Sequence, residues 1–276
     1  MERRVHGVWR GTAAVRGGRT VLADSYQQAP LKVAKPFYAE DGTMVIYLMD
    51  ASPGLLGGDR YEIACALGPG ARLFLTTQSS CRLHPGAEEA ESVLIQRFRV
   101  ERGAVLEYFP DPVVPFAGSR HRGETVLEVA AGGVALVAET VTPGRWGMGE
   151  VFRFADLRLQ TSIYCDGVWT AWDSLWIEPA GMPMGTAWGE FTHMATLWVV
   201  SDQLGEEEIE LLREVTEAGE EEIYGGVSRL ERGGCVLRAL SRSVRPLQAW
   251  VYRVREVLRP CLIGSPAWPV RKPGSI

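Results

Sequence analysis

The sequence has few groupings of the residues that bind transition metals tightly or cross-link a chain. Its four histidines, His6, His84, His121 and His193, are scattered, and no two of its five cysteines form a Cys-x-x-Cys pair. A tight site for a divalent transition metal usually draws on clustered imidazole or thiolate, and a disulfide framework on cysteines at paired spacings. The spacing predicts reduced thiols, buried as small hydrophobic residues, and no local metal cluster.

The common local signatures of enzymes are missing as well. There is no G-x-x-x-x-G-K-[ST] nucleotide loop, no H-E-x-x-H and no G-x-S-x-G, which argues against P-loop nucleotide binding, zincin metalloproteases and α/β hydrolases. A net charge of −5 argues against a general nucleic-acid binder. No apolar run approaches the length of a membrane span, and no signal-peptide core follows the first residues. We expect a cytoplasmic protein that binds neither nucleic acid nor membrane.

What the sequence does contain is a long series of short β-strand patterns. Residues 61–67 and 94–100 alternate apolar with small, polar or charged residues, the period of a half-buried strand. Residues 134–139 are mostly apolar, as in a strand covered on both faces. Glycine-containing turns separate these patterns at short intervals, as at residues 68–70 and 101–103. The pattern favours an all-β sandwich, barrel or solenoid.

Two late segments have helical periodicity instead. Glu206 to Glu217 carries apolar residues at helical spacing and acidic residues in its first turn. The segment from about Val244 to Arg259 has one apolar stripe and ends just before Pro260. We therefore predict a single β-rich domain over residues 1–276, with two helices in its C-terminal third.

The segment from Ser52 to Asp59, SPGLLGGD, predicts a tight and geometrically specified turn. Glycine allows positive φ and close approach of two backbones, so Gly54, Gly57 and Gly58 would hold Asp59 at a fixed place. Asp59 is the best single candidate for a functional carboxylate. The alternative is a structural aspartate that accepts backbone hydrogen bonds in its own turn.

Two further segments carry candidate polar groups. Residues 76–80, TTQSS, follow an apolar strand and would either reach solvent or line a water-filled passage. Residues 144–150, GRWGMGE, would form a glycine-held loop in which Arg145 pairs with a carboxylate. For Glu150 the alternatives are contact with a metal ion and a salt bridge that fixes the loop.

The order of these motifs resembles that of a known family. The sequence contains PLK at 30–32, GLLGGD at 54–59, TTQS at 76–79, LEYFPDP at 106–112 and GR-x-x-x-GE at 144–150. Each motif is weak alone, but the five in this order resemble the UreD (UreH) urease accessory proteins. The resemblance runs from about Ser25 to the closing Arg271-Lys272.

The resemblance implies a β-helix-like stack of sheets with two helices and a scaffold role in urease maturation, without enzymatic activity. Such a protein binds apo-urease and the accessory proteins UreF and UreG, in a 2:2 assembly with dimeric UreF. Nickel would be transient cargo that moves through an internal passage, and no cofactor would be bound permanently. The implied nickel contacts are Asp59 and Glu150, and the implied passage-lining or motif residues are Lys32, Gly57, Gly58, Thr76, Thr77, Gln78, Ser79, Ser80, Asp111 and Arg145. The implied partner contacts are Trp250, Arg253, Val254 and Leu258.

Two other functions fit the residues alone. A β-helical carbohydrate-active enzyme would use two of Asp59, Asp111 and Glu150, held about 5–10 Å apart across a sugar-sized cleft. A purely structural β scaffold would have no metal role.

Overall fold

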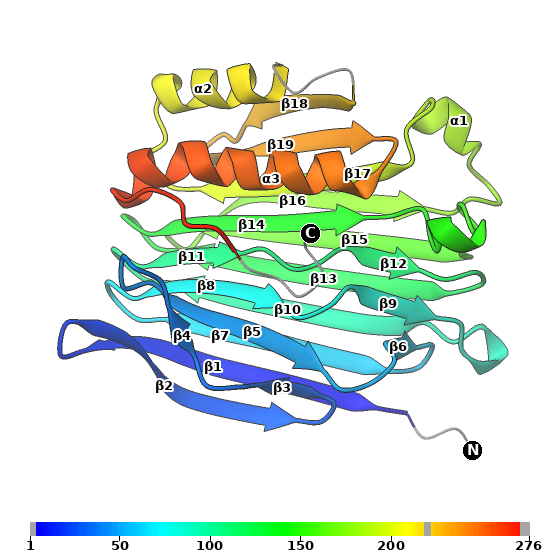
Figure 1. The fold of residues 1–276 in the computed structure, drawn as a ribbon, viewed down its shortest axis with the longest axis horizontal. Helices are drawn as coiled ribbons and strands as arrows, with labels where there is room; N and C mark the ends of the chain where they lie inside the picture. The colour runs from blue at the N-terminus through cyan, green and yellow to red at the C-terminus, as the bar shows by residue number, and fades with distance from the viewer. Residues whose placement is uncertain (1–3, 218–221, 271–276) are drawn as a thin grey trace.

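The computed structural model describes residues 4–217 and 222–270, so Arg271 and Lys272, where the family resemblance ends, lie outside the described residues. The fold is mainly β and consists of two stacked sheets, with one long helix against a sheet and another at the end of the stack (Figure 1). This confirms the predicted fold class.

The first sheet has seven strands. Their order is β16 (Val168–Ile177), β15 (Asp156–Cys165), β13 (Arg120–Val129), β10 (Ser92–Val100), β7 (Arg60–Leu67), β1 (His6–Arg16) and β2 (Arg19–Gln28). Strands β1, β7, β10, β13 and β15 run parallel to one another. The edge strands β2 and β16 pair antiparallel with their neighbours, β1 and β15 respectively.

The second sheet has twelve strands. Its main path is β18 (Ile223–Arg229), β19 (Gly234–Ser241), β17 (His193–Val200), β14 (Val134–Val141), β11 (Val105–Tyr108), β8 (Arg72–Thr77), β5 (Met44–Asp50) and β3 (Leu31–Val33). Four short strands pair beside this path: β4 (Phe37–Tyr38), β6 (Leu55–Leu56), β9 (Cys81–His84) and β12 (Val113–Pro115).

From β7 to β15 the chain winds as a solenoid, passing from one sheet to the other and back. The corner turns stack on one another: the Gly70 amide donates to the Arg102 carbonyl at 3.1 Å, and the Gly103 amide to the Gly132 carbonyl at 2.9 Å. Successive turns of the solenoid therefore add parallel strands to both sheets. A sandwich would show the same period of two along each strand, so only the parallel pairing distinguishes the two folds.

Parallel register places inward side chains of neighbouring strands in rows across the first sheet. Cys65, Phe98, Leu127 and Ile163 form an apolar row that packs in the core between the sheets. Two residues earlier along each of these strands is a second inward row, which is mostly polar and consists of Ile63, Gln96, Thr125 and Thr161. The polar row is where the space between the sheets is not filled by apolar side chains.

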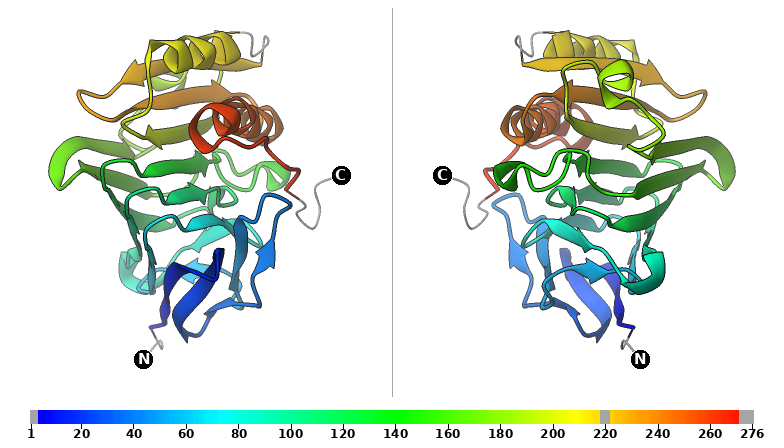
Figure 2. Two further views of the ribbon diagram at one scale, coloured as in Figure 1. Left: turned by 90° about the vertical axis from the view of Figure 1, so that its left-hand side faces the viewer. Right: turned by 90° about the vertical axis from the view of Figure 1, so that its right-hand side faces the viewer.

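A second apolar core lies between the larger sheet and the helices. Helix α3 (Val244–Leu258) packs on β14, β17 and β19, and α2 (Glu206–Glu217) packs on β18 and α3. Viewed along the strands, the sheets form two walls, with α3 outside one wall and α2 at the end of the stack (Figure 2). The two predicted helices are confirmed, and the four-residue helix α1 (Met184–Ala187) is an addition that the sequence pattern missed.

Three irregular turns complete the backbone. They are η1 (Ala87–Glu89), η2 (Trp146–Met148) and η3 (Arg259–Ile263), the last continuing directly from α3. Strand β14 lies between both cores, with Val137 in the inter-sheet core and Leu136 in the helix-side core. This double covering explains the apolar run predicted at residues 134–139.

Candidate functional site

A cavity of about 90 Å³ lies between the two sheets. A water molecule needs at least about 10–15 Å³ of such space, so the cavity has room for several. Its polar lining comes from both sheets and comprises Asp50, Tyr61, Thr77, Ser79, Ser80, Cys81, Gln96, Tyr108, Asp111, His121, Thr125, Glu139, Thr140 and Thr161. Oxygen atoms predominate among these groups, which is the ligand type of a site for hard or weakly held cations.

Four of the predicted passage residues line this cavity: Thr77, Ser79, Ser80 and Asp111. The Thr77 hydroxyl lies 3.3 Å from Asp111 Oδ2 and accepts the Asp111 backbone amide at 2.7 Å. This pair links the TTQSS and LEYFPDP segments across neighbouring strands, as expected if both motifs serve one interior site.

The other residues of the TTQS and PLK motifs point elsewhere. Because side chains alternate along β8, Thr76 faces the helix-side core, where its hydroxyl donates to the Phe109 carbonyl at 2.5 Å. Gln78 and Lys32 are exposed and do not line the cavity. These three residues of the predicted passage-lining or motif set therefore lie away from the cavity.

Asp59 is buried, with 6% of its surface exposed, and does not line the cavity. Its Oδ1 accepts the Val5 amide at 2.8 Å, and its Oδ2 accepts the Leu56 amide at 3.0 Å. Both oxygens thus serve the backbone, which is the structural alternative set out above. A nickel contact at Asp59 stays a prediction.

The turn that carries Asp59 has the geometry predicted from its glycines. Gly54 and Gly58 have φ values of +137° and +94°. A β-carbon at Gly57 would lie 2.2 Å from the Ala90 carbonyl oxygen, so only glycine fits there.

Glu150 forms the salt bridge that was the alternative to metal contact. Arg145 Nε donates to Glu150 Oε2 at 2.8 Å, a second guanidinium nitrogen pairs with Oε1, and the Ala117 amide lies 3.3 Å from Oε2. The hydrogen bonds from Arg145 lower the pKa of Glu150. Neither residue lines the cavity, so this loop is held apart from the interior site.

Glu139 and Asp50 add two carboxylates to the cavity that the motif analysis missed. Burial, and secondly the charge of Asp173, raise the pKa of Glu139 to about 7. Asp50 accepts hydrogen bonds from Tyr61 at 3.2 Å and from the Ser52 amide at 2.8 Å. Glu139 ends an apolar run, and that interruption was the one available signal of an inward carboxylate.

His121 also lines the cavity and is 1% exposed. Its Nδ1 lies 2.9 Å from the Ser92 hydroxyl, and its Nε2 is buried without a hydrogen-bond partner. Burial lowers the pKa of His121 to about 3, so its imidazole is neutral near pH 7.

Within residues 4–217 and 222–270, no group of three or more histidine, cysteine, aspartate or glutamate side chains is placed to hold a metal ion. The cavity therefore offers separate donors rather than a closed cage.

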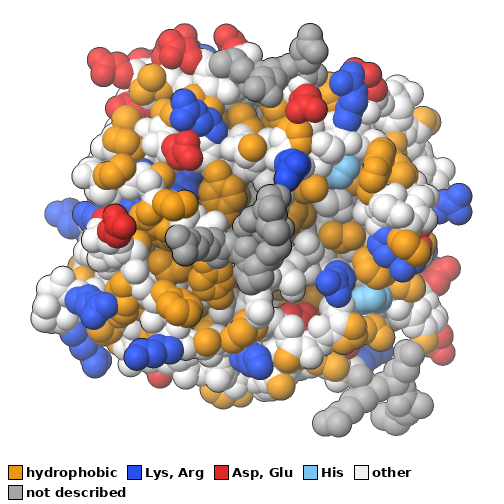
Figure 3. All heavy atoms as spheres, viewed as in Figure 1, with side chains coloured by type: hydrophobic (Ala, Val, Ile, Leu, Met, Phe, Trp, Pro, Cys, Tyr) orange, Lys and Arg blue, Asp and Glu red, His pale blue; other side chains and the backbone are white. Residues whose placement is uncertain are grey.

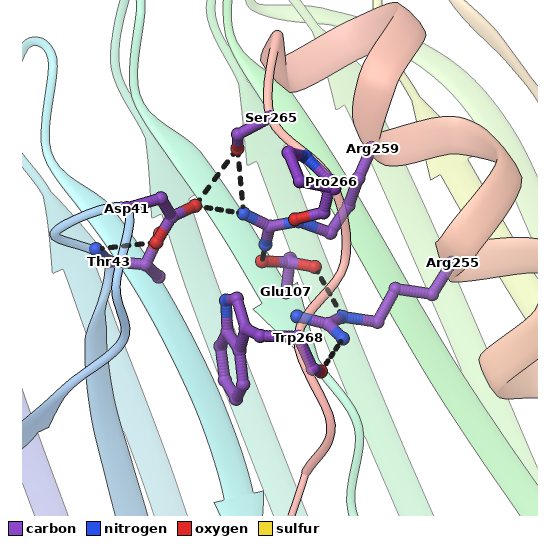
Figure 4. A network of polar contacts seen from close by, with 8 residues as sticks. All are labelled: Asp41, Thr43, Glu107, Arg255, Arg259, Ser265, Pro266 and Trp268. Carbon is purple, nitrogen blue, oxygen red and sulfur yellow. Dashed lines mark hydrogen bonds and ion pairs between the residues drawn. The ribbon is translucent and has the colours of Figure 1, made fainter.

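A buried ionic network outside the cavity involves another residue of the LEYFPDP motif, Glu107 (Figure 4). Arg255 Nε donates to Glu107 Oε1 at 2.7 Å, and Arg259 pairs with both Glu107 and Asp41. Glu107 and Arg259 are fully buried, and the Arg255 guanidinium lies 4.5 Å from the ring centre of Trp268. The network joins β11 to the end of α3 and the chain that follows it.

The predicted partner contacts on α3 divide into two groups. Trp250, Val254 and Leu258 are buried in the helix-side core, so the structure corrects their assignment to a partner surface. Arg253 lies on the opposite, exposed face and pairs with Glu256 at 3.2 Å. Of the four residues, Arg253 alone is accessible to a partner.

The helices in the described part of the chain include none that is long and apolar enough to cross a membrane.

Comparison with known proteins gives a consistent result. The family described as UreD urease accessory protein matches residues 6–273. Urease accessory protein UreD of Acetivibrio thermocellus is 33% identical over 249 residues, covering 89% of this chain and 94% of the relative. Urease accessory protein UreD 2 of Streptomyces griseus is 33% identical over 94% of this chain and 91% of its own. Urease accessory protein UreH of Helicobacter pylori strain J99 is 28% identical over 83% and 86%. The chain belongs to the UreD family of urease accessory proteins.

Proposed function

We propose that this chain is a urease maturation factor that relays nickel through its interior cavity to apo-urease. Membership of the UreD family supports a role in urease maturation. The observation that supports the relay is the cavity between the sheets, whose lining includes several hydroxyl groups and the carboxylates of Asp50, Asp111 and Glu139. The chain acts as a scaffold and conduit, and nickel is its cargo.

The chemistry of the lining suits such a relay. A divalent ion that leaves water needs oxygen ligands to replace its hydration shell, and negative charge to offset burial. Single carboxylates and hydroxyls supply both, yet they bind weakly enough to release the ion. The pair formed by Thr77 and Asp111 lies where the two polar motifs meet, so we place a nickel contact there.

The proposed partners are UreF, UreG and apo-urease. UreF would dock on the face that carries α3 and link the chain to UreG, and UreF dimerisation would give the 2:2 assembly. On this face hydrophobic side chains are exposed between α3 and the β4–β5 region (Figure 3). They include Phe37, which is 61% exposed, and Arg253 lies on the exposed side of α3.

The test is nickel-dependent activation of urease in a reconstituted system with UreF, UreG and apo-urease. Asp111→Ala and Glu139→Ala remove cavity carboxylates, and both are expected to reduce activation while pull-downs with each partner stay unchanged. Glu128→Ala is the matched control, because Glu128 lies on the outer face of the first sheet and pairs there with Arg99.

Full activation by both cavity variants, with partner binding intact, would rule out the relay.

Asp59→Asn belongs in the same series, and its thermal midpoint is measured as well. A lower midpoint together with weaker partner binding would make Asp59 a purely structural residue.

A further inference from the structure

We infer that Nε2 of His121 is a nitrogen ligand for the nickel ion inside the cavity. The inference rests on the proposed function, since it assigns a residue to the relay. It adds an imidazole to a passage whose other donors are mainly oxygen atoms.

The contacts of Ser92 are compatible with the tautomer that this role needs. The Ser92 hydroxyl lies 3.3 Å from the Arg120 carbonyl oxygen and 2.9 Å from His121 Nδ1. When the hydroxyl donates its one hydrogen to the carbonyl, it accepts from Nδ1, and in that tautomer the lone pair is on Nε2. Metal-binding histidines are held in the same way, with the distal ring nitrogen donating to a neighbouring acceptor.

Gly123 keeps a β-carbon away from Nε2. Gly123 lies two residues along β13 on the same inward face, and both residues line the cavity. A β-carbon at Gly123 would lie 3.6 Å from His121 Nε2 and 2.7 Å from Leu159 Cδ2. The methyl group of Leu159 therefore packs against Gly123, and Nε2 faces the cavity without a side chain from position 123 beside it.

His121 Nε2 also lacks a hydrogen-bond partner. A buried acceptor without a partner is unfavourable, and His121 Nε2 is the one histidine nitrogen left so in the described chain. Imidazole binds nickel, zinc and copper well, whereas magnesium and calcium prefer oxygen. His121 would thus give the passage a preference for transition metals.

The experiment measures Ni²⁺ binding to the purified full chain by calorimetry, with Mg²⁺ as a second probe. His121→Gln keeps a polar side chain but loses the imidazole, and we expect Ni²⁺ affinity to fall about tenfold or more, with little change for Mg²⁺. His193→Gln is the matched control, because His193 is also buried but does not line the cavity. In parallel, paramagnetic Ni²⁺ should broaden the NMR ring signals of His121 before those of His193.

Unchanged Ni²⁺ affinity in a folded His121→Gln variant would overturn the inference, and so would His121 ring signals that Ni²⁺ leaves sharp; a water molecule would then be the partner of Nε2. If His121→Gln does not fold, Gly123→Ala decides, since it keeps the imidazole and fills the adjacent space. Undiminished Ni²⁺ affinity in Gly123→Ala would also overturn it. Reduced urease activation by Glu139→Ala, alongside unchanged Ni²⁺ binding by His121→Gln, would leave the proposed function standing without this ligand.

Discussion

Glu107 shows how a single buried charge ties distant parts of the chain together. It lies between Arg255 and Arg259, which are about 150 residues later in the sequence, and all three side chains are buried. Such an arrangement is sensitive to the loss of one member, because the remaining charges cannot return to water without unfolding. We therefore assign Glu107 a structural role within the LEYFPDP motif.

We expect Glu107→Gln to lower the free energy of unfolding by about 3–5 kcal/mol, since it leaves two buried guanidinium groups facing a neutral amide. Urea unfolding followed by tryptophan fluorescence measures the change. Glu256→Gln, at an exposed ion pair on α3, is the control and should change stability little. Equal, small effects of the two variants would contradict the proposed role of the network.

Glu139 makes stability depend on pH. Its pKa is about 7 in the folded chain against an ordinary value of 4.5. Between these values the folded state holds a proton that the unfolded state has released, so the free energy of unfolding falls as pH rises from 4.5 to 7. The loss is on the order of 3 kcal/mol and is complete above pH 7.

Glu139→Gln stays neutral throughout, so we expect it to match the wild-type thermal midpoint at pH 5 and to exceed it at pH 8. Calorimetric scans at the two pH values test this. If the thermal midpoints of variant and wild type differ by the same amount at pH 5 and at pH 8, the Glu139 carboxyl group does not have a raised pKa.

At the scale of elements, α3 separates two tasks between its two faces. Trp250, 4% exposed, fills the core between the helix and the larger sheet, whereas Arg253 lies on the solvent side. The apolar face holds the helix on the sheet, so the opposite face is the part that is free to meet a partner.

Trp250→Ala is expected to cost about 3–5 kcal/mol of folding free energy, because it opens a large cavity in this core. Arg253→Glu should leave the unfolding curve unchanged and weaken the pull-down of UreF. UreF binding at wild-type strength by Arg253→Glu would move the proposed interface away from α3.

At the scale of the whole molecule, the open end of the first sheet is apolar. Strand β16 is one of its two edge strands, and Trp169, Trp172 and Trp176 on it are each more than half exposed. An exposed edge strand with large apolar side chains and no lysine or proline favours association with other chains. Three of the nine tryptophans of the sequence thus lie on this surface.

We expect the isolated chain to self-associate as its concentration rises, and Trp172→Lys to reduce this association without lowering the thermal midpoint. Light scattering over a concentration series measures it. Leu211→Lys, which replaces an exposed apolar residue on α2, is the control. Identical scattering by wild type and Trp172→Lys would show that β16 takes no part in association.

Local patterns in the sequence determined the fold class, the two long helices and the glycine-held turn before Asp59. These features depend on periodicity, capping and backbone freedom, which act within a few residues. The start and end of α2 at Glu206 and Glu217 follow directly from such signals. Thr77 was singled out by the polar run that follows an apolar strand, whereas Asp111 was indicated by the family resemblance.

Only the tertiary structure decided which side chains meet. The period of two in residues 94–100 says that Gln96 lies on the face of Phe98. It does not say that parallel register brings β7, β10, β13 and β15 together in rows, nor what faces those rows from the other sheet. Helical periodicity likewise could not show whether the apolar stripe of α3 packs in the chain's own core or against a partner. Contacts between residues some 30 to 150 positions apart depend on how the solenoid stacks, and that is a property of the whole chain.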